Sequence, residues 1–201
     1  FNAPGYRTLL REFPDFSHLT YLETLDLSFT SIHELQDNFT SLTHLTALMM
    51  DGCTSLTKLA PSLSNCVNLR SLSCNNCKLN RADSLPNFRA TQLSHLSLVE
   101  NSMTIWPDGL CLLPAGASVD EWYRLALILD YNPLIDPPAC FGTVVGLHQA
   151  SFSLADFTSF PSVFTSMTRL FYLRITDSKK MTGGIPSLSG MTSLVTLALS
   201  A

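Results

Sequence analysis

The chain has 201 residues with a formal net charge of −4, and 46% of the residues are hydrophobic, which is typical of a globular protein with its own core and argues against a disordered chain. The small charge and the lack of a Lys/Arg cluster predict that neither nucleic acid nor a membrane surface is a partner. The longest apolar runs, such as residues 125–129, fall far short of the roughly 18 to 20 residues that a membrane-spanning helix needs.

A six-residue motif recurs along the whole chain. Its first copy is Leu22-Glu-Thr-Leu25-Asp-Leu27, and later copies keep apolar residues at the first, fourth and sixth positions, with Arg124 as an exception at the first. The copies start near residues 22, 45, 69, 93, 124, 147, 170 and 194. Apolar and polar residues alternate within each copy, so each one predicts a short, half-buried strand.

The segment after each strand also repeats. The position eight residues past each start is small or polar, and it is occupied by Thr30, Cys53, Cys77, Asn101, Asn132, Ala155 and Ser178. A polar side chain stacked there can bond the backbone groups that a tight turn leaves unpaired, which Ala155 cannot do. Prolines such as Pro61 and Pro161 fall seven to ten residues before the next start and predict an irregular chain or a short helical turn. Since one such coil cannot bury its own apolar face, neighbouring coils must stack into a continuous core.

These units resemble the L-x-x-L-x-L-x-x-N/C-x-L pattern of leucine-rich repeats. The resemblance covers nearly the whole chain and implies an α/β fold, a curved leucine-rich-repeat solenoid with parallel strands on the concave face and irregular or short helical turns on the convex face. Residues 51–56 resemble repeats of plant intracellular immune receptors, residues 183–186 resemble plant receptor-kinase ectodomains, and residues 129–134 are similar to oomycete surface proteins. We expect residues 1–201 to form one solenoid of about eight repeats, uncapped at both ends, that belongs to a longer chain.

One interval between strands is about seven residues longer than the others. The extra residues lie at about 111–122, and insertions in solenoids go into loops that often carry function. Ser118 and Glu121 have the spacing of a helix start, so the alternative is a helical turn that packs Trp122 against the back of the solenoid.

The six cysteines and one glycosylation sequon bear on the compartment of the protein. Cys74 and Cys77 form a CxxC, but one holds an inward strand position and the other the turn position, which predicts buried structural thiols in place of a metal or redox site. A disulfide between Cys53 and Cys77, which occupy the turn position of adjacent coils, stays open as an alternative. Two further cysteines, Cys111 and Cys140, lie outside the inward positions and are better candidates for a surface disulfide. The sequon at Asn38 predicts a glycan on the back of a coil and favours a secreted or surface protein.

The residues predicted to face outward on the concave sheet are mostly small and hydroxylated, whereas larger side chains gather in the C-terminal half. The predicted ligand-binding patch consists of Ile128, Tyr131, Leu154, Tyr172 and Arg174, because aromatic and arginine side chains commonly anchor interfaces. No HExxH, GxSxG or P-loop motif occurs, and no titratable set suggests catalysis or a metal site. We therefore expect a non-catalytic module that needs no cofactor and binds a protein or peptide ligand as part of a larger receptor-like protein, either extracellular or on the cell surface.

Two other functions stay open at this point. The hydroxyl-rich face also fits an architectural component of a cell surface or wall. The resemblance to intracellular immune receptors implies instead a sensor region that works in the cytoplasm.

Overall fold

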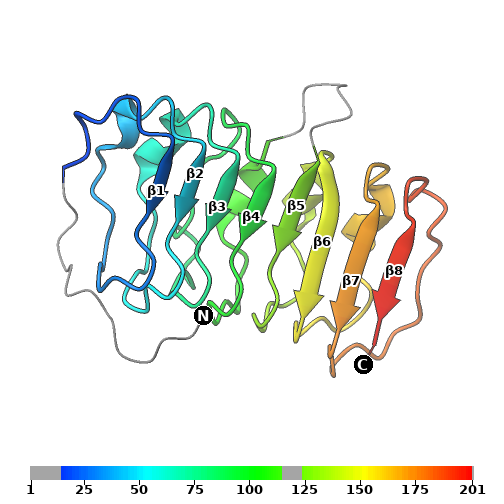
Figure 1. The fold of residues 1–201 in the computed structure, drawn as a ribbon. Helices are drawn as coiled ribbons and strands as arrows, with labels where there is room; N and C mark the ends of the chain where they lie inside the picture. The colour runs from blue at the N-terminus through cyan, green and yellow to red at the C-terminus, as the bar shows by residue number, and fades with distance from the viewer. Residues whose placement is uncertain (1–14, 115–123, 201) are drawn as a thin grey trace.

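A computed structural model describes residues 15–114 and 124–200 of the chain. Its eight strands form one parallel sheet, in which each strand lies beside its neighbours in the sequence (Figure 1). The strands are β1 (Thr24–Asp26), β2 (Ala47–Met49), β3 (Ser71–Ser73), β4 (His95–Ser97), β5 (Leu125–Ile128), β6 (Leu147–Ser153), β7 (Tyr172–Thr176) and β8 (Thr196–Leu199). Because parallel neighbours need a crossover connection, the chain returns behind the sheet after each strand. The helix start proposed at Ser118, Glu121 and Trp122 lies outside the described residues.

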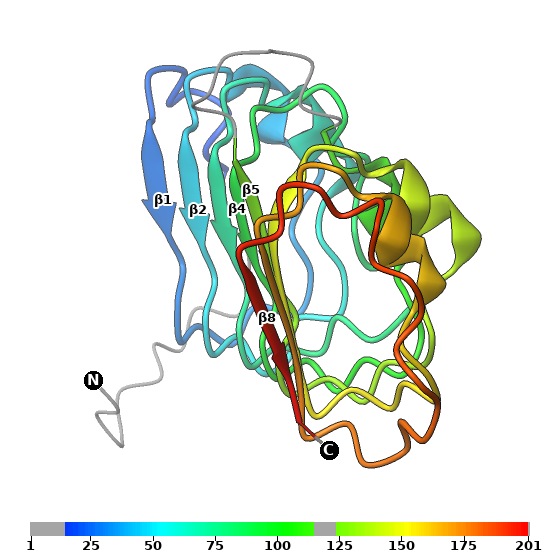
Figure 2. The same ribbon diagram turned by 90° about the vertical axis from the view of Figure 1, so that its right-hand side faces the viewer.

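Short 3-10 helices form the second layer, behind the sheet (Figure 2). They are η1 (Phe39–Ser41), η2 (Pro61–Asn65), η3 (Asp108–Leu112), η4 (Ala139–Thr143) and η5 (Ser162–Ser166). Pro61 is the first residue of η2, and Pro107, Pro138 and Pro161 precede the last three helices. Proline suits a helix start because its φ is fixed there and no N–H donor is needed. No helix in the described ranges has the length and apolarity to cross a lipid bilayer.

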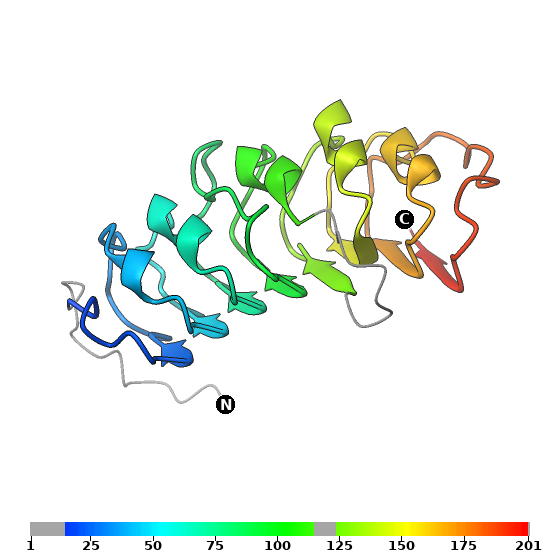
Figure 3. The ribbon, with the colours of Figure 1, turned by 90° about the horizontal axis from the view of Figure 1, so that it is seen from above.

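The coils follow an arc, with the sheet along its inner side and the helical turns along its outer side (Figure 3). The core lies between these two layers. The sheet contributes a row of paired inward residues, including Leu48, Leu72 and Leu96, and the turns contribute buried side chains such as Phe39 and Phe164. Burial of each such side chain contributes about 1.5–3 kcal/mol. The curved solenoid with short helical turns on its convex side, which the resemblance to leucine-rich repeats implies, is confirmed.

The fifth coil departs from the repeat pattern by one residue. Arg124 is exposed at the position where the two neighbouring coils bury Leu93 and Leu147, and Leu125 is buried in its place and pairs with Leu147. The pairing then shifts, so that Ala126 lies beside Gln149. An arginine at the inward position would lose its hydration, and a bulge that admits one extra residue on β6 lets Leu125 be buried instead.

The predicted ladder of turn side chains forms in the second to fifth coils, where each turn side chain donates a hydrogen bond to a backbone carbonyl of the preceding coil. Cys53 Sγ donates to Leu27 O at 3.2 Å, and Cys77 Sγ donates to Met50 O at 3.2 Å. In the next coil Asn101 Nδ2 donates to Cys74 O at 2.7 Å.

Asn132 makes the most side-chain hydrogen bonds among the described turn residues: its Nδ2 donates to Leu98 O at 2.8 Å, and its Oδ1 accepts the N–H groups of Asn101 and Met103. The ladder weakens after it, because Ala155 has no polar atom to offer. In the following coil the buried Ser178 Oγ has no hydrogen-bond partner among the described residues.

The cysteines divide into two groups. Cys53, Cys66, Cys74 and Cys77 are free and buried, so the CxxC pair consists of structural thiols and no disulfide joins the two turn positions. Burial raises the pKa of the Cys66 thiol to about 11 and raises the pKa of the Cys74 thiol well above its usual value, which keeps both thiols protonated.

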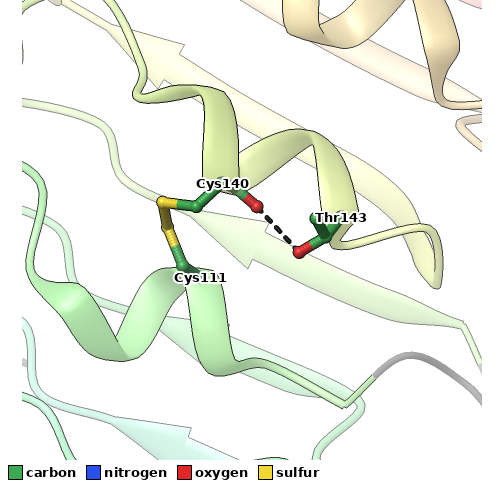
Figure 4. Close-up of a disulfide and its surroundings, with 3 residues drawn as sticks. All are labelled: Cys111, Cys140 and Thr143. Carbon is green, nitrogen blue, oxygen red and sulfur yellow. Dashed lines mark hydrogen bonds between the residues drawn. A yellow bond between two sulfur atoms is a disulfide. The ribbon is translucent and has the colours of Figure 1, made fainter.

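The remaining two cysteines form a disulfide on the outer side of the solenoid. Cys111 in η3 is bonded to Cys140 in η4, with their Cα atoms 5.5 Å apart (Figure 4). The bond joins the helical turn of the long interval to that of the next coil, and Thr143 Oγ1 donates to the carbonyl oxygen of Cys140 at 2.8 Å. The sequence indicated these two residues as the candidates for a surface disulfide, and the structure confirms that pairing.

Candidate functional site

The concave sheet has a recess of about 230 Å³ over strands β5, β6 and β7. The outward side chains around it come from Ile128, Asp130, Gln149, Ser151, Tyr172 and Arg174. Period-two alternation places them on the inner side of the arc, opposite the core. In the strand register Ile128 pairs with Ser151, which in turn pairs with Arg174. A small serine between two large side chains therefore accounts for the hollow.

A hydrogen-bonded carboxylate holds the arginine at the edge of this recess. Asp130 Oδ1 accepts the hydroxyl of Ser151 at 2.8 Å and the N–H of Ser153 at 2.7 Å. The other oxygen, Asp130 Oδ2, lies 3.6 Å from Arg174 Nη1. The Asp130 side chain is almost buried, at 13% exposure, whereas the Arg174 side chain is 40% exposed. Since guanidinium carries five N–H donors and this contact engages one side of it, Arg174 keeps donors that face solvent.

Three of the five residues in the predicted patch meet at the recess. Ile128, Tyr172 and Arg174 line it. Tyr131 and Leu154 do not, because they follow the strands at the turn, with φ near 60° at both residues and their side chains exposed at one edge of the sheet. Their N–H groups donate to Ser153 O and Thr176 O of the next coils, which places the two residues in a row of their own. The predicted patch therefore consists of two separate groups.

Sequence reasoning left Asp130, Gln149 and Ser151 out of the patch. Asp130 and Ser151 occupy outward positions of the strand motif, so position alone could not separate them from the other polar residues there. The feature that could have identified the recess is the size of the neighbouring side chains, since the small Ser151 lies between Ile128 and Arg174 once the strands are aligned.

Many outward polar residues hold the sheet together and are engaged before any ligand arrives. Asp51 Oδ1 accepts the N–H of Asn75 at 2.8 Å, and Asn75 Oδ1 accepts the N–H of Val99 at 2.8 Å. In the same way, Asp130 Oδ1 accepts the N–H of Ser153 at 2.7 Å. These side chains form a second ladder beside that of the turns, which leaves fewer free polar groups on the concave face than the outward pattern suggested.

His148 is half-buried at the start of β6. Its ring stacks on Phe171 with ring centroids 5.0 Å apart, and its Nδ1 lies 3.2 Å from Arg169 O. Burial lowers the pKa of His148, so the neutral ring is favoured near pH 7. In the ranges that the structure describes, no group of three or more His, Cys, Asp or Glu side chains is arranged to hold a metal ion.

Neither the models of known protein families nor the curated proteins contain a match to this sequence. Solved structures do match. The leucine-rich repeat domain of the type III effector XCV3220 (XopL) aligns with a TM-score of 0.65 and 16% identity over 95% of this chain and 73% of the other. The chain has the leucine-rich-repeat fold.

Two further leucine-rich-repeat neighbours are much longer proteins. The plant peptide hormone receptor RGFR1, solved in complex with RGF2, has a TM-score of 0.60 and 21% identity over 92% of this chain. The functional domain of InlJ from Listeria monocytogenes, which includes a cysteine ladder, has a TM-score of 0.54 and 18% identity over 90% of this chain. The chain spans 29% of the length of RGFR1 and 40% of that of InlJ. Likeness at these identities concerns the fold and leaves the ligand to be inferred from the site.

Proposed function

We propose that this leucine-rich-repeat solenoid is a non-catalytic recognition module that binds a protein or peptide ligand on its concave face, as part of a larger receptor-like or surface protein. The observation that carries the proposal is the preformed recess over β5–β7, where Arg174 is held beside the apolar side chains of Ile128 and Tyr172. Tyrosine and arginine in a partly desolvated site are typical anchors of binding energy.

The recess fits one large side chain of a ligand together with a hydrogen-bond acceptor. Its volume of about 230 Å³ lies just below the range of sites that hold a whole small molecule, which favours a segment of a longer ligand over a free metabolite. Ile128 and Tyr172 would cover the apolar part of that side chain, and the free donors of Arg174 would bind its acceptor. Because Asp130 already orients the guanidinium, little side-chain entropy is lost when the ligand binds. The complex of the similar receptor RGFR1 with RGF2 supports a peptide ligand.

The proposal is tested with a ligand selected from a displayed random-peptide library on the full chain. Ala substitutions at Arg174 and Tyr172 are expected to weaken binding of the selected peptide by about tenfold or more each, which corresponds to about 1.4 kcal/mol. Ser73→Ala, on the same face but away from the recess, serves as the matched control. Full affinity in the Arg174 and Tyr172 variants, with loss on substitution of the convex side, would remove the recess as the site.

Two features support placement outside the cell. The disulfide between Cys111 and Cys140 is of a kind that persists in oxidising compartments. The sequon residue Asn38 lies at the start of η1 on the outer side, and its Nδ2 is 3.4 Å from Asp15 Oδ1, so a glycan there would replace one weak exposed contact. Intact mass of the natural protein, before and after reduction and glycosidase treatment, tests this placement. Six free thiols without a glycan would favour the cytoplasmic sensor instead.

A further inference from the structure

A second hollow lies on the outer side of the solenoid, where the fourth and fifth coils approach η3 and η4. It has a volume of about 240 Å³, and we call it the outer groove. Its lining includes Ile105, Trp106, Ile135, Pro138 and the disulfide of Cys111 and Cys140. None of these residues belongs to the recess on the concave sheet.

The two isoleucines break a polar pattern. A buried apolar residue lies two positions after the turn residue of the ladder, such as Ile32, Leu79 or Phe157 in the first, third and sixth coils. The next two residues of these coils are exposed and polar, namely His33 and Glu34, Asn80 and Arg81, and Thr158 and Ser159. In the fourth and fifth coils the same stretch contributes Ile105, 42% exposed, and Ile135, 55% exposed. The N–H of Ile135 donates to Thr104 O, so the two coils lie side by side here. A pair of exposed isoleucines beside a hollow, in a row that is otherwise polar, indicates an interaction surface.

The floor and walls of the groove are rigid. Trp106 is buried, its Nε1 donates to Ile135 O at 2.7 Å, and its ring lies 4.8 Å from that of Phe141, centroid to centroid. The disulfide joins the two helical turns above the floor, and Pro138 fixes the backbone beside it. A groove that exists before binding costs less ordering entropy when a partner docks.

The rim of the groove is acidic. Asp108 and Asp136 are exposed and line it, and in the described part of the chain neither carboxylate pairs with a Lys, Arg or His. Asp136 accepts the N–H and hydroxyl of Thr158, which fixes its position without neutralising its charge. A cation on a partner would therefore meet two uncompensated negative charges next to an apolar surface.

We propose that the outer groove is a second docking site, which takes a protein segment presenting one large apolar side chain directly beside a lysine or arginine. The apolar side chain packs on Trp106 between Ile105 and Ile135, and the neighbouring cation lies against Asp108 and Asp136. The site does not depend on the concave recess, so a partner can occupy it while the recess holds its own ligand.

The test uses three capped dipeptide amides as probes, namely acetyl-Phe-Arg, acetyl-Phe-Glu and acetyl-Ser-Arg, in ¹H–¹⁵N NMR titrations of the full chain. Saturable shifts of amides in residues 104–108 and 134–140 are expected with acetyl-Phe-Arg, and binding about fivefold weaker or more with each of the other two. Equal binding of all three, shifts at the concave recess in their place, or no saturable shift at all would overturn the proposal.

A pair of substitutions provides the matched control. Ile135→Ser is expected to abolish the shifts, whereas Ile185→Ser, at an equally exposed isoleucine outside the groove, leaves them unchanged. Both side chains are more than half exposed, so both variants should unfold at the temperature of the parent protein. Asp108→Asn is expected to reduce the preference for acetyl-Phe-Arg over acetyl-Phe-Glu by about half or more, since it removes one rim charge. Retained binding in a folded Ile135→Ser variant would refute the groove as the site.

Discussion

Replacing Asn132 by alanine tests whether the turn ladder carries much of the stability of the solenoid. Asn132 is fully buried, and its side-chain amide donates to the carbonyls of Leu98 and Leu129 at 2.8 and 3.0 Å. Its Oδ1 accepts the N–H groups of Asn101 and Met103 at 2.9 and 3.1 Å. The substitution takes a hydrogen bond from four buried backbone groups, of which Leu98 O keeps another donor, Asn101 Nδ2 at 3.0 Å, and the other three are left short of a partner. A buried polar group without its partner costs about 1–3 kcal/mol, and because water and small shifts recover part of this, we expect a total loss of about 4 kcal/mol.

Such a loss would be a large fraction of the roughly 5–15 kcal/mol that separates folded from unfolded domains. The assay is urea unfolding followed by circular dichroism, with the free energy taken by linear extrapolation. The ladder supplies its own controls. Cys77→Ala removes the thiol hydrogen bond to Met50 O and should cost less than Asn132→Ala, about 1–2 kcal/mol. Ser178→Ala removes a buried hydroxyl without a described partner, and should be neutral or slightly stabilising.

The order of the three variants by their loss of unfolding free energy therefore tests whether the turn ladder stabilises the solenoid. If Asn132→Ala cost less than about 1 kcal/mol, or if Ser178→Ala cost as much as Asn132→Ala, the ladder would not be a main source of stability and the reasoning from hydrogen-bond satisfaction would fail.

Three further predictions follow from local features. Gly52 has φ of +71°, and an added Cβ would lie 2.6 Å from Phe29 Cδ1, so Gly52→Ala should destabilise the protein by about 1 kcal/mol or more, and a second substitution, Phe29→Ala, should recover part of that loss in urea unfolding. Replacing Cys111 and Cys140 together by serine opens a loop with a sequence separation of 29 residues and should cost about 3 kcal/mol; an unchanged melting temperature in calorimetry would contradict this. Burial lowers the pKa of His148, so as the pH falls the unfolded chain takes up the proton before the folded protein does. The contribution of the neutral, buried His148 to stability is therefore complete above the usual histidine pKa near 6.5 and falls as the pH drops below it. His148→Gln should reduce the pH dependence of the urea midpoint between about pH 7 and pH 5.

The sequence was sufficient for those parts of the fold that depend on one coil at a time. An inward leucine such as Leu72 and a turn residue such as Asn101 are each determined by local burial and by backbone groups that need a partner, so spacing alone predicts them. The pairing of Cys111 with Cys140 could also be predicted from the sequence, because neither residue fits an inward position.

The candidate site was only partly predictable because it depends on which side chains neighbouring coils place next to each other. The recess exists because Ser151 is small between Ile128 and Arg174, and this comparison needs the strand register. The register itself shifts at Leu125, since Arg124 cannot be buried. Tyr131 was assigned to the same patch as Tyr172, yet a positive φ in the turn after each of the strands β1 to β7 directs the row of Tyr131 to the edge of the sheet. These are tertiary effects that one repeat read in isolation cannot reveal.

The source of stability changes along the solenoid, and the change coincides with both candidate surfaces. The turn ladder weakens after Asn132, where Ala155 offers no hydrogen bond, and aromatic packing takes its place. Phe152 in β6 lies 5.9 Å from Trp106 and 5.5 Å from Phe164, ring centroid to ring centroid. Each such pair contributes about 0.5–1.5 kcal/mol beyond its burial.

This aromatic cluster lies between the two candidate surfaces. Phe152 points into the core from the strand whose outward residue Ser151 lines the recess, and Trp106 forms the floor of the outer groove. Close-packed rings transmit a change of volume because they leave no space to absorb it. A smaller residue at Phe152 would therefore loosen both surfaces together, whereas Arg174 and Ile135 each affect only one of them. Substitutions at exposed positions should thus change the concave recess and the outer groove separately, whereas a substitution in the aromatic core should change both.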